Sequence, residues 1–149
     1  MLYKKILVAL DGSEQANKAL DHALDIAEKY RAAETQLVHV VQRVTSFVYT
    51  GVGAEPVWLG TIYDNFEKSG KLVLEEGKKK AEEKKTNVKI STKLLHGNPA
   101  DEIVKLAKDE KFDLIVVGSR GLSGVRELIL GSVSGKIVNN ATVPVLVVK

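Results

Sequence analysis

The stretch Leu114-Ile115-Val116-Val117-Gly118-Ser119-Arg120-Gly121 decides how the rest of the chain is interpreted. Its first four residues form a continuous apolar run, which is typical of a strand buried on both faces. After nine intervening residues, the step Gly131-Ser132 opens the last predicted helix. Glycines at a strand end and at a helix start let backbone N–H groups converge on an anion, and the helix dipole adds about half a positive charge there. The stretch therefore predicts a site for the phosphates of a nucleotide.

Strand and helix patterns alternate on both sides of this stretch. Strands are predicted at residues 6–10, 37–41, 88–93, 114–117 and 145–148, and residues 88–93 alternate as an edge strand does. Helices are predicted at about residues 16–27, 57–85, from Pro99 onward and from Ser132 onward. Such alternation implies right-handed β-α-β units, so the expected fold class is α/β with helices on both faces of a parallel sheet.

Local signals mark where these helices begin and how one of them packs. Either Asp11 or Ser13 has the chemistry to cap the first helix, and Asn98 followed by Pro99 is a favourable start for the third. The second helix carries two interior glycines, which cost about 1 kcal/mol each in helix propensity. Both belong to its apolar stripe, so we expect them to pack closely on the sheet. The stripe consists of Leu59, Ile62, Phe66, Gly70, Val73, Gly77 and Ala81.

The topology of such sheets points to one edge for a ligand. Ligands bind beyond the carboxyl ends of the strands, where the strand order reverses. The first and fourth predicted strands end at Asp11 and Gly118, so these two turns are expected to meet. That position favours a ligand contact for Asp11 over a purely capping role. Two interpretations fit Arg120 equally: an ordinary surface residue, or a partner of a phosphate group.

Composition excludes several classes of protein. The 149 residues are 44% apolar, which predicts one globular domain over residues 1–149. A net charge of +3 with mixed signs argues against binding to nucleic acid. The chain has no cysteine, and therefore no disulfide or thiolate metal site. No signal peptide is recognisable and no apolar run approaches the ~18 residues that span a membrane, so the cytoplasm is the expected location and no membrane partner is predicted.

The histidines and aromatic residues favour structural over chemical roles. His39 lies within an apolar strand and is expected to be a hydrogen-bonded core residue, whereas His22 is expected to be exposed. His96 precedes a glycine at the end of the third strand, where a loop role is favoured over a site role. Their scatter gives neither a metal cluster nor a catalytic residue. Trp58, Tyr63 and Phe66 are expected in a core or an interface, and residues 42–56 are expected to form a loop.

At this point several stretches together resemble the universal stress protein family. They are Ala9-Leu10-Asp11-Gly12-Ser13, His39-Val40, the Gly-x2-Gly-x9-Gly-Ser motif at 118–132, Ser132-Val133-Ser134, and Val143-Pro144-Val145-Leu146-Val147-Val148. The resemblance covers nearly the whole chain. It implies a five-stranded parallel sheet in the order 3-2-1-4-5, a homodimer and, in members with this glycine motif, ATP binding.

The resemblance also implies roles for individual residues. Asp11 would bond the ribose or adenine with Ala9 lining the pocket beside it, and Val40 would contact the adenine through its backbone. A second group would line the ribose and phosphate path: Gly118, Ser119, Arg120, Gly121 and Gly124. A third group would hold phosphates: Gly131, together with Ser132, Val133 and Ser134 through their backbone N–H groups and hydroxyls. Mg²⁺ would be carried by the phosphates, and AMP, ADP and ATP all remain candidate ligands.

Four functions are compatible with these features. The favoured one is a nucleotide-binding regulatory module whose bound state is recognised by a protein partner. A slow ATPase is the enzymatic alternative, although the chain lacks the Gly-x4-Gly-Lys-Ser/Thr phosphate loop. An adenylating enzyme of similar fold would need a Ser-Gly-Gly-x-Asp-Ser loop that is absent at Asp11-Gly12-Ser13. The fourth is a structural dimer without ligand.

Dimer formation is expected at the last strand, whose apolar residues would leave an open edge.

Overall fold

The fold is seen in a computed structural model that describes residues 2–42, 57–120 and 130–149, without the side chains of residues 57–62. A parallel sheet of five strands has the order β3-β2-β1-β4-β5. The strands are β1 (Lys5–Ala9), β2 (Glu34–Val41), β3 (Lys89–His96), β4 (Leu114–Gly118) and β5 (Val145–Val148). The predicted fold class and strand order are therefore confirmed.

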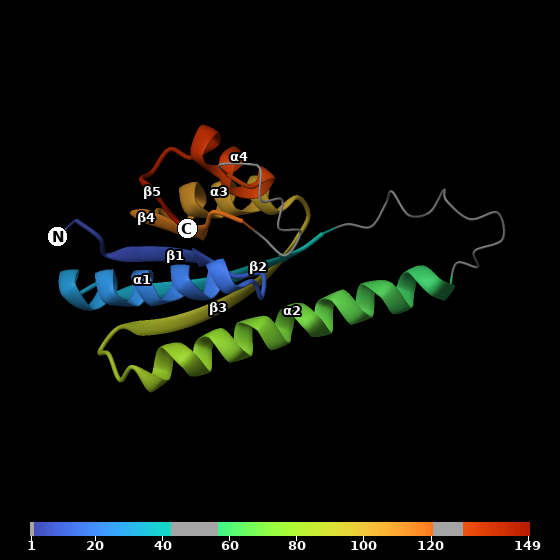
Figure 1. Ribbon diagram of the computed structural model, residues 1–149, viewed down its shortest axis with the longest axis horizontal. Coiled ribbons are helices and arrows are strands. Elements are labelled where there is room, and N and C mark those ends of the chain that lie inside the picture. Colours follow the sequence, from blue (N-terminus) through green and yellow to red (C-terminus); the bar gives the residue numbers. More distant parts are fainter. Residues whose placement is uncertain (1, 43–56, 121–129) are drawn as a thin grey trace.

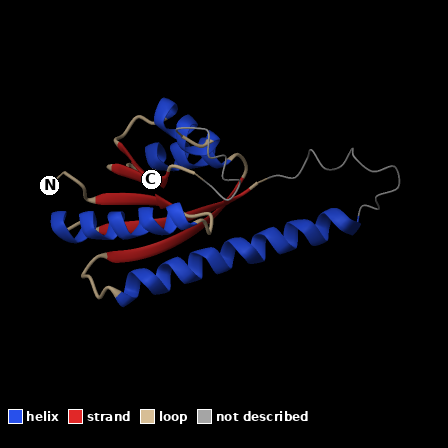
Figure 2. Cartoon of the chain, viewed as in Figure 1, coloured by secondary structure: helices blue, strands red, loops and turns tan. Residues whose placement is uncertain are grey.

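Helices cover both faces of this sheet (Figures 1 and 2). The helices are α1 (Glu14–Tyr30), α2 (Val57–Glu83), α3 (Pro99–Asp109) and α4 (Ser132–Asn140). One core cluster lies between the sheet and α1 with α2, and a second lies between the sheet and α3 with α4. Within the described ranges, no helix has both the length and the apolar character needed to cross a membrane.

Two strands are longer than the apolar pattern predicts. β2 begins at Glu34 rather than at residue 37, because its polar first residues find partners on β3. The Ser91 hydroxyl donates to Glu34 Oε1 at 2.7 Å and accepts from Gln36 Nε2 at 3.3 Å. β3 continues to His96, and its register matches β2 over all eight residues. β1 ends at Ala9, although the Leu10 N–H still donates to the Val38 carbonyl at 2.8 Å.

The structure shows which residue caps α1, a role that the sequence left open between Asp11 and Ser13. Ser13 is the N-cap of α1, since its Oγ accepts from the Ala16 N–H at 3.1 Å. Asp11 instead accepts the Ser13 N–H through Oδ1 at 2.8 Å, so it shapes the turn before the cap. The predicted start of α3 is confirmed, because Asn98 caps it and Pro99 is its first residue.

The close packing expected of the α2 glycines is confirmed, whereas Phe66 on the same stripe lies outside the core. A methyl group at Gly70 would lie 2.6 Å from His39 Cδ2, and one at Gly77 would lie 2.5 Å from Leu10 Cδ1. Both glycines therefore allow close packing, as predicted. Phe66, however, is 48% exposed. The N-terminal part of α2 runs past the ends of the strands (Figure 1), so the stripe has less sheet to pack against there.

We expect Thr35→Val to raise the free energy of unfolding by about 1 kcal/mol, because a buried hydroxyl without a partner carries an uncompensated desolvation cost. Thr35 is fully buried, and its Oγ1 has no hydrogen-bond partner among the described residues. Urea denaturation measures the change. Thr35→Ser keeps the hydroxyl and removes the methyl group, so it should be less stable than the parent. A Thr35→Val protein no more stable than the parent would contradict this account.

Candidate functional site

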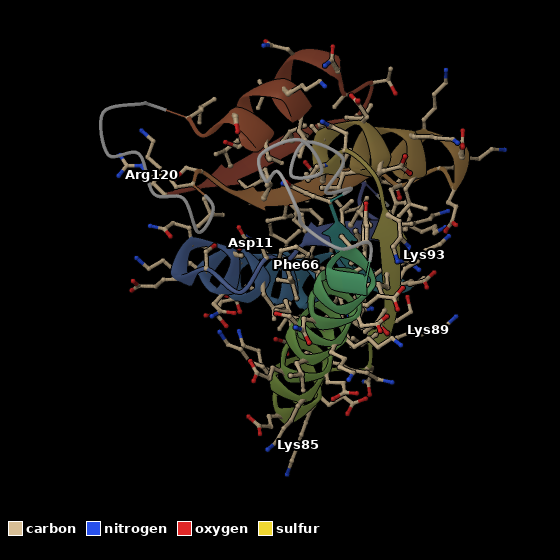
Figure 3. The ribbon with its side chains drawn as sticks, turned by 90° about the vertical axis from the view of Figure 1, so that its right-hand side faces the viewer. Asp11, Phe66, Lys85, Lys89, Lys93 and Arg120 are labelled. Carbon is tan, nitrogen blue, oxygen red and sulfur yellow. The ribbon has the colours of Figure 1, made fainter. Side chains whose placement is uncertain are left out.

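The candidate site lies at the edge where the parallel strands end. β1 pairs with β4 as well as with β2, so the turns after β1 and β4 leave from neighbouring strands. Figure 3 looks onto this edge, with Asp11 and Arg120 labelled. A side chain at Gly118 would lie 2.8 Å from the Gln15 carbonyl carbon and 2.9 Å from the Ala16 nitrogen. Close packing of α1 on the end of β4 is therefore sufficient reason for glycine at this position.

One backbone carbonyl joins the two described ends of the glycine-rich segment. The Ser119 oxygen accepts the Gly131 N–H at 2.6 Å and the Ser134 hydroxyl at 2.9 Å. The Ser119 N–H in turn donates to the Val148 carbonyl of β5 at 2.7 Å. Ser119 and Ser134 are both buried. The Ser134 hydroxyl therefore holds α4 against the end of β4, and this protein contact occupies its hydrogen.

No side chain of the described residues caps the N-terminus of α4. Its N-cap is Gly131, with φ −66° and ψ 167°, and no side-chain hydrogen bond is made there. The first N–H groups of an α-helix have no partner within the helix. Those of Ser132, Val133 and Ser134 are therefore available to an anion, with the positive end of the helix dipole behind them. At α1 and α3 the equivalent groups are capped by Ser13 and Asn98.

A hollow of about 580 Å³ opens beside the uncapped N-terminus of α4. The starts of α3 and α4 both line it, as do the ends of β2 and β3. Of the predicted site residues, Ser132 and Val133 belong to its lining, whereas Ala9, Asp11 and Val40 do not. The full lining is Gln42, His96, Gly97, Asn98, Pro99, Ala100, Asp101, Glu102, Ser132, Val133 and Lys136.

Val40 presents its backbone to the same edge. The Val38 carbonyl accepts from Leu10 on the β1 side, and the Val41 carbonyl accepts from Gly97 on the β3 side. Backbone groups in a strand alternate in direction, so those of Val40 point toward β1 at a level beyond its last residue. Its side chain is buried in the second core cluster. Backbone N–H and C=O groups so placed suit the hydrogen-bonding edge of a base.

The remaining predicted residues have varied surroundings. Asp11 is half-buried, with Oδ1 bonded to the Ser13 N–H and no partner for Oδ2 among the described residues. Ala9 is half-buried against the second core cluster. Arg120 is half-buried at the end of a described range. Gly121 and Gly124 lie outside the described residues, as do residues 43–56, which contain most of the predicted loop.

Sequence reasoning assigned no site role to most of the residues that line the hollow on α3, on α4 and at the end of β3. His96 is the last residue of β3, and its Nε2 lies 2.7 Å from Glu67 Oε1 of α2. Lys136 forms an ion pair with Asp101 at 3.0 Å, joining α4 to α3. Two signals were available: the Asn98-Pro99 start follows a strand of the same sheet, and Lys136 lies four residues after Ser132, on the same helix face. The described residues contain no group of three or more acidic or histidine side chains able to hold a metal ion.

Comparison with known proteins identifies the family. A sequence model of the Universal stress protein family matches residues 2–149. The chain belongs to the universal stress protein family. A universal stress protein of Bacillus subtilis is 42% identical over 151 residues, which cover 99% of this chain and 100% of that protein.

Solved structures of universal stress proteins share the fold. One from Methanocaldococcus jannaschii has a TM-score of 0.85 and 33% identity, covering 100% of this chain and 97% of that chain. Another, solved in complex with cAMP, has a TM-score of 0.73 and 26% identity, covering 100% of this chain and 99% of that chain.

The two serines at the start of α4 should respond differently to alanine. Ser134→Ala should lower the free energy of unfolding by about 1 kcal/mol or more, because the Ser119 carbonyl loses a buried hydrogen-bond donor. Ser132→Ala is the matched control, since the Ser132 side chain is exposed and its loss should change stability by less than about 0.5 kcal/mol. Chemical denaturation of both variants measures the difference. Equal stabilities would show that the Ser134 hydroxyl does not join α4 to β4.

Proposed function

We propose that this protein binds an adenine nucleotide at the carboxyl edge of its sheet, with the phosphates on the N-terminus of α4. The observation that carries the proposal is the uncapped first turn of α4 opening on a hollow of about 580 Å³. A volume of this order is typical of small-molecule sites, about 300–1,000 Å³. Free N–H groups with a helix dipole behind them suit phosphate, and the neighbouring hollow has room for a ligand.

The complex of a related universal stress protein with cAMP supports an adenine ring in the ligand. In this chain, the groups that would recognise the adenine and ribose are the Val40 backbone and Asp11 Oδ2, which has no partner among the described residues. A paired N–H and C=O suits the edge of adenine, and a carboxylate accepts hydrogen bonds from ribose hydroxyls or an amino group. Ala9 would line the pocket beside Asp11.

The phosphate path continues this assignment toward α4. Gly118, Ser119, Arg120, Gly121 and Gly124 would line the ribose and phosphates, and Gly131 to Ser134 would hold the phosphate end. For Ser134 we assign only the backbone N–H, because its hydroxyl already donates to Ser119. We propose ATP as the working ligand, with Mg²⁺ bound through the phosphates rather than by a set of protein ligands.

The biological role that fits such a site is regulation rather than turnover. We propose that nucleotide occupancy changes the surface around the site and that a protein partner in the cytoplasm reads this change during stress. Occupancy shifts the equilibrium between two surfaces only as far as the nucleotide prefers one of them. The proposed link from ligand to surface is the carboxyl edge itself, where the five parallel strands end and where α1, α3 and α4 begin.

Ser132→Pro tests the phosphate assignment by removing a backbone N–H while leaving the helix intact. Proline is tolerated at the first position of a helix, and α3 already begins with Pro99. Isothermal titration calorimetry with ATP and AMP should show binding to the parent and about tenfold weaker ATP binding to Ser132→Pro.

Asp11→Asn, the companion variant, keeps an acceptor for the Ser13 N–H but removes the carboxylate. It should weaken ATP and AMP binding alike, because it acts on the nucleoside. Ser132→Ala removes the exposed hydroxyl but keeps the N–H, so it should bind ATP more tightly than Ser132→Pro. Absence of heat with both nucleotides on folded parent protein would refute the proposed function.

We also propose a homodimer that forms through β5, an edge strand of the sheet. The carbonyls of Pro144 and Val148 point toward β4, so alternation directs the backbone of Val145 and Val147 outward. The strand consists of Val-Leu-Val-Val, with no charged residue to discourage edge pairing. Two copies that met edge to edge would satisfy these outward groups.

Val147→Pro should convert this dimer into a monomer. It removes an outward N–H but leaves the bonds between β5 and β4, which is the condition under which an edge strand tolerates proline. Val147→Thr keeps the N–H and a similar shape, so it should remain dimeric. Size-exclusion chromatography with light scattering at micromolar concentration measures the mass. A monomeric parent, or a dimeric Val147→Pro, would rule out pairing through β5.

A further inference from the structure

Helix α2 packs against both sides of the turn that carries Asp11. On the β1 side, Leu10 packs into the notch at Gly77, meaning the gap that the absent side chain leaves on α2. A methyl group on Gly77 would lie 2.5 Å from Leu10 Cδ1. Leu37 Cδ1 and Leu20 Cδ2 would lie 3.3 and 3.8 Å from the same methyl group. Leu10 itself is 4% exposed and has little room to withdraw. The contact between Leu10 and the α2 backbone is therefore set by the absence of a side chain at residue 77.

On the far side of Asp11, Gly12 faces α2 directly. Gly12 has φ +84°, and a methyl group there would lie 3.4 Å from Val73 Cγ2. The left-handed backbone needs glycine, and the side chain of Val73 covers the α2 side of this residue. Leu10 and Gly12 are thus both held by one helix, one turn apart along its stripe, with Asp11 between them.

A third contact reaches the same turn through His39. The ring fits the notch at Gly70, where a methyl group would lie 2.6 Å from Cδ2 and 3.1 Å from Nε2. Its Nδ1 lies 2.7 Å from the Leu10 carbonyl, and because a carbonyl can only accept, Nδ1 carries the hydrogen. His39 therefore connects the α2 backbone to the peptide that joins Leu10 to Asp11.

The same helix also contacts the wall of the hollow. Glu67 Oε1 lies 2.7 Å from His96 Nε2, and His96 lines the hollow. Glu67, Gly70, Val73 and Gly77 follow one another at spacings of three and four, so they share one face of α2. From Glu67 to Gly77, that face contacts the end of β3, then His39 of β2, then the turn after β1.

We propose that Gly70 and Gly77 are positioning residues for nucleotide binding, because they let α2 hold the Asp11 turn in its binding geometry. The inference rests on the proposed function, since it assigns a distant cause to the placement of Asp11. Glycine lowers helix propensity at both positions, and alanine would raise it by about 1 kcal/mol per site. The close approach of α2 to the sheet at Gly70 and Gly77 offsets this loss of helix propensity. The same close approach brings the Asp11 carboxylate into place.

The experiment uses Gly77→Ala, Leu10→Val and the double variant, with Ser69→Ala as the control. Ser69 is exposed on α2, so its replacement changes helix propensity without filling a notch. AMP affinity is measured by calorimetry at a temperature where thermal melts show each protein folded. Gly77→Ala should bind about tenfold more weakly than the parent. Adding Leu10→Val removes the methyl group that clashes, and it should restore most of the affinity. Ser69→Ala should bind as the parent does.

The amide resonance of Ser13, measured without ligand, separates this inference from the proposed function. Its N–H donates to Asp11 Oδ1, so its chemical shift reports the turn itself. Gly77→Ala should move this resonance, and the double variant should move it back. If the parent binds no nucleotide, the proposed function fails, and this amide alone decides whether α2 positions the turn.

Two results would overturn the inference. One is parent-like AMP affinity in folded Gly77→Ala when the parent itself binds. The other is an unmoved Ser13 amide. Should Gly77→Ala fail to fold, Gly70→Ala and Val73→Ala replace it, the first filling the His39 notch and the second removing the contact with Gly12. The same two readouts then apply, with both variants expected to weaken binding and to move the Ser13 amide.

Discussion

β1 forms hydrogen bonds with β2 on one side and with β4 on the other, and all three strands run in the same direction. Right-handed crossovers place α1 and α2 on one face of the sheet and α3 and α4 on the other. The turns after β1 and β4 therefore depart toward opposite faces from adjacent strand ends. Ligands of such sheets bind at this point, and the backbone of Val40, the turn at Asp11 and the start of α4 all lie at this edge of the sheet.

The Ser119 carbonyl determines where α4 begins in this arrangement. By accepting from both Gly131 and Ser134, it fixes the first turn of α4 relative to the end of β4. The Ser119 N–H bonds to Val148, so the glycine-rich segment is also attached to β5. β5 consequently has the candidate site on its inner side and the proposed dimer contact on its outer side.

Residue patterns predicted the layers, the strand order through family resemblance, and the glycine notches of α2. They failed where tertiary partners override local polarity, as at Glu34 and Gln36, whose place in β2 depends on Ser91. They did not distinguish a core from an interface position for the exposed Phe66, because no local pattern reports where the sheet beneath a helix ends. The candidate site was predicted from its motifs, yet the assignment of the Ser134 hydroxyl to phosphate missed its contact with Ser119, fifteen residues away. The spacing of residues indicates which side chains lie on the same face of a helix. The hydrogen bonds that each side chain makes depend on partners that are distant in the sequence.

Charge explains why a ligand with phosphates would choose α4 although α3 also begins at the hollow. The first turn of α3 contains Asp101 and Glu102, which oppose a second anion, and its free N–H groups are reduced by Pro99 and by the Asn98 cap. The first turn of α4 contains no acidic residue, and Lys136 offsets Asp101 through their ion pair. Two helix dipoles therefore point at one hollow, and only that of α4 remains available to phosphate.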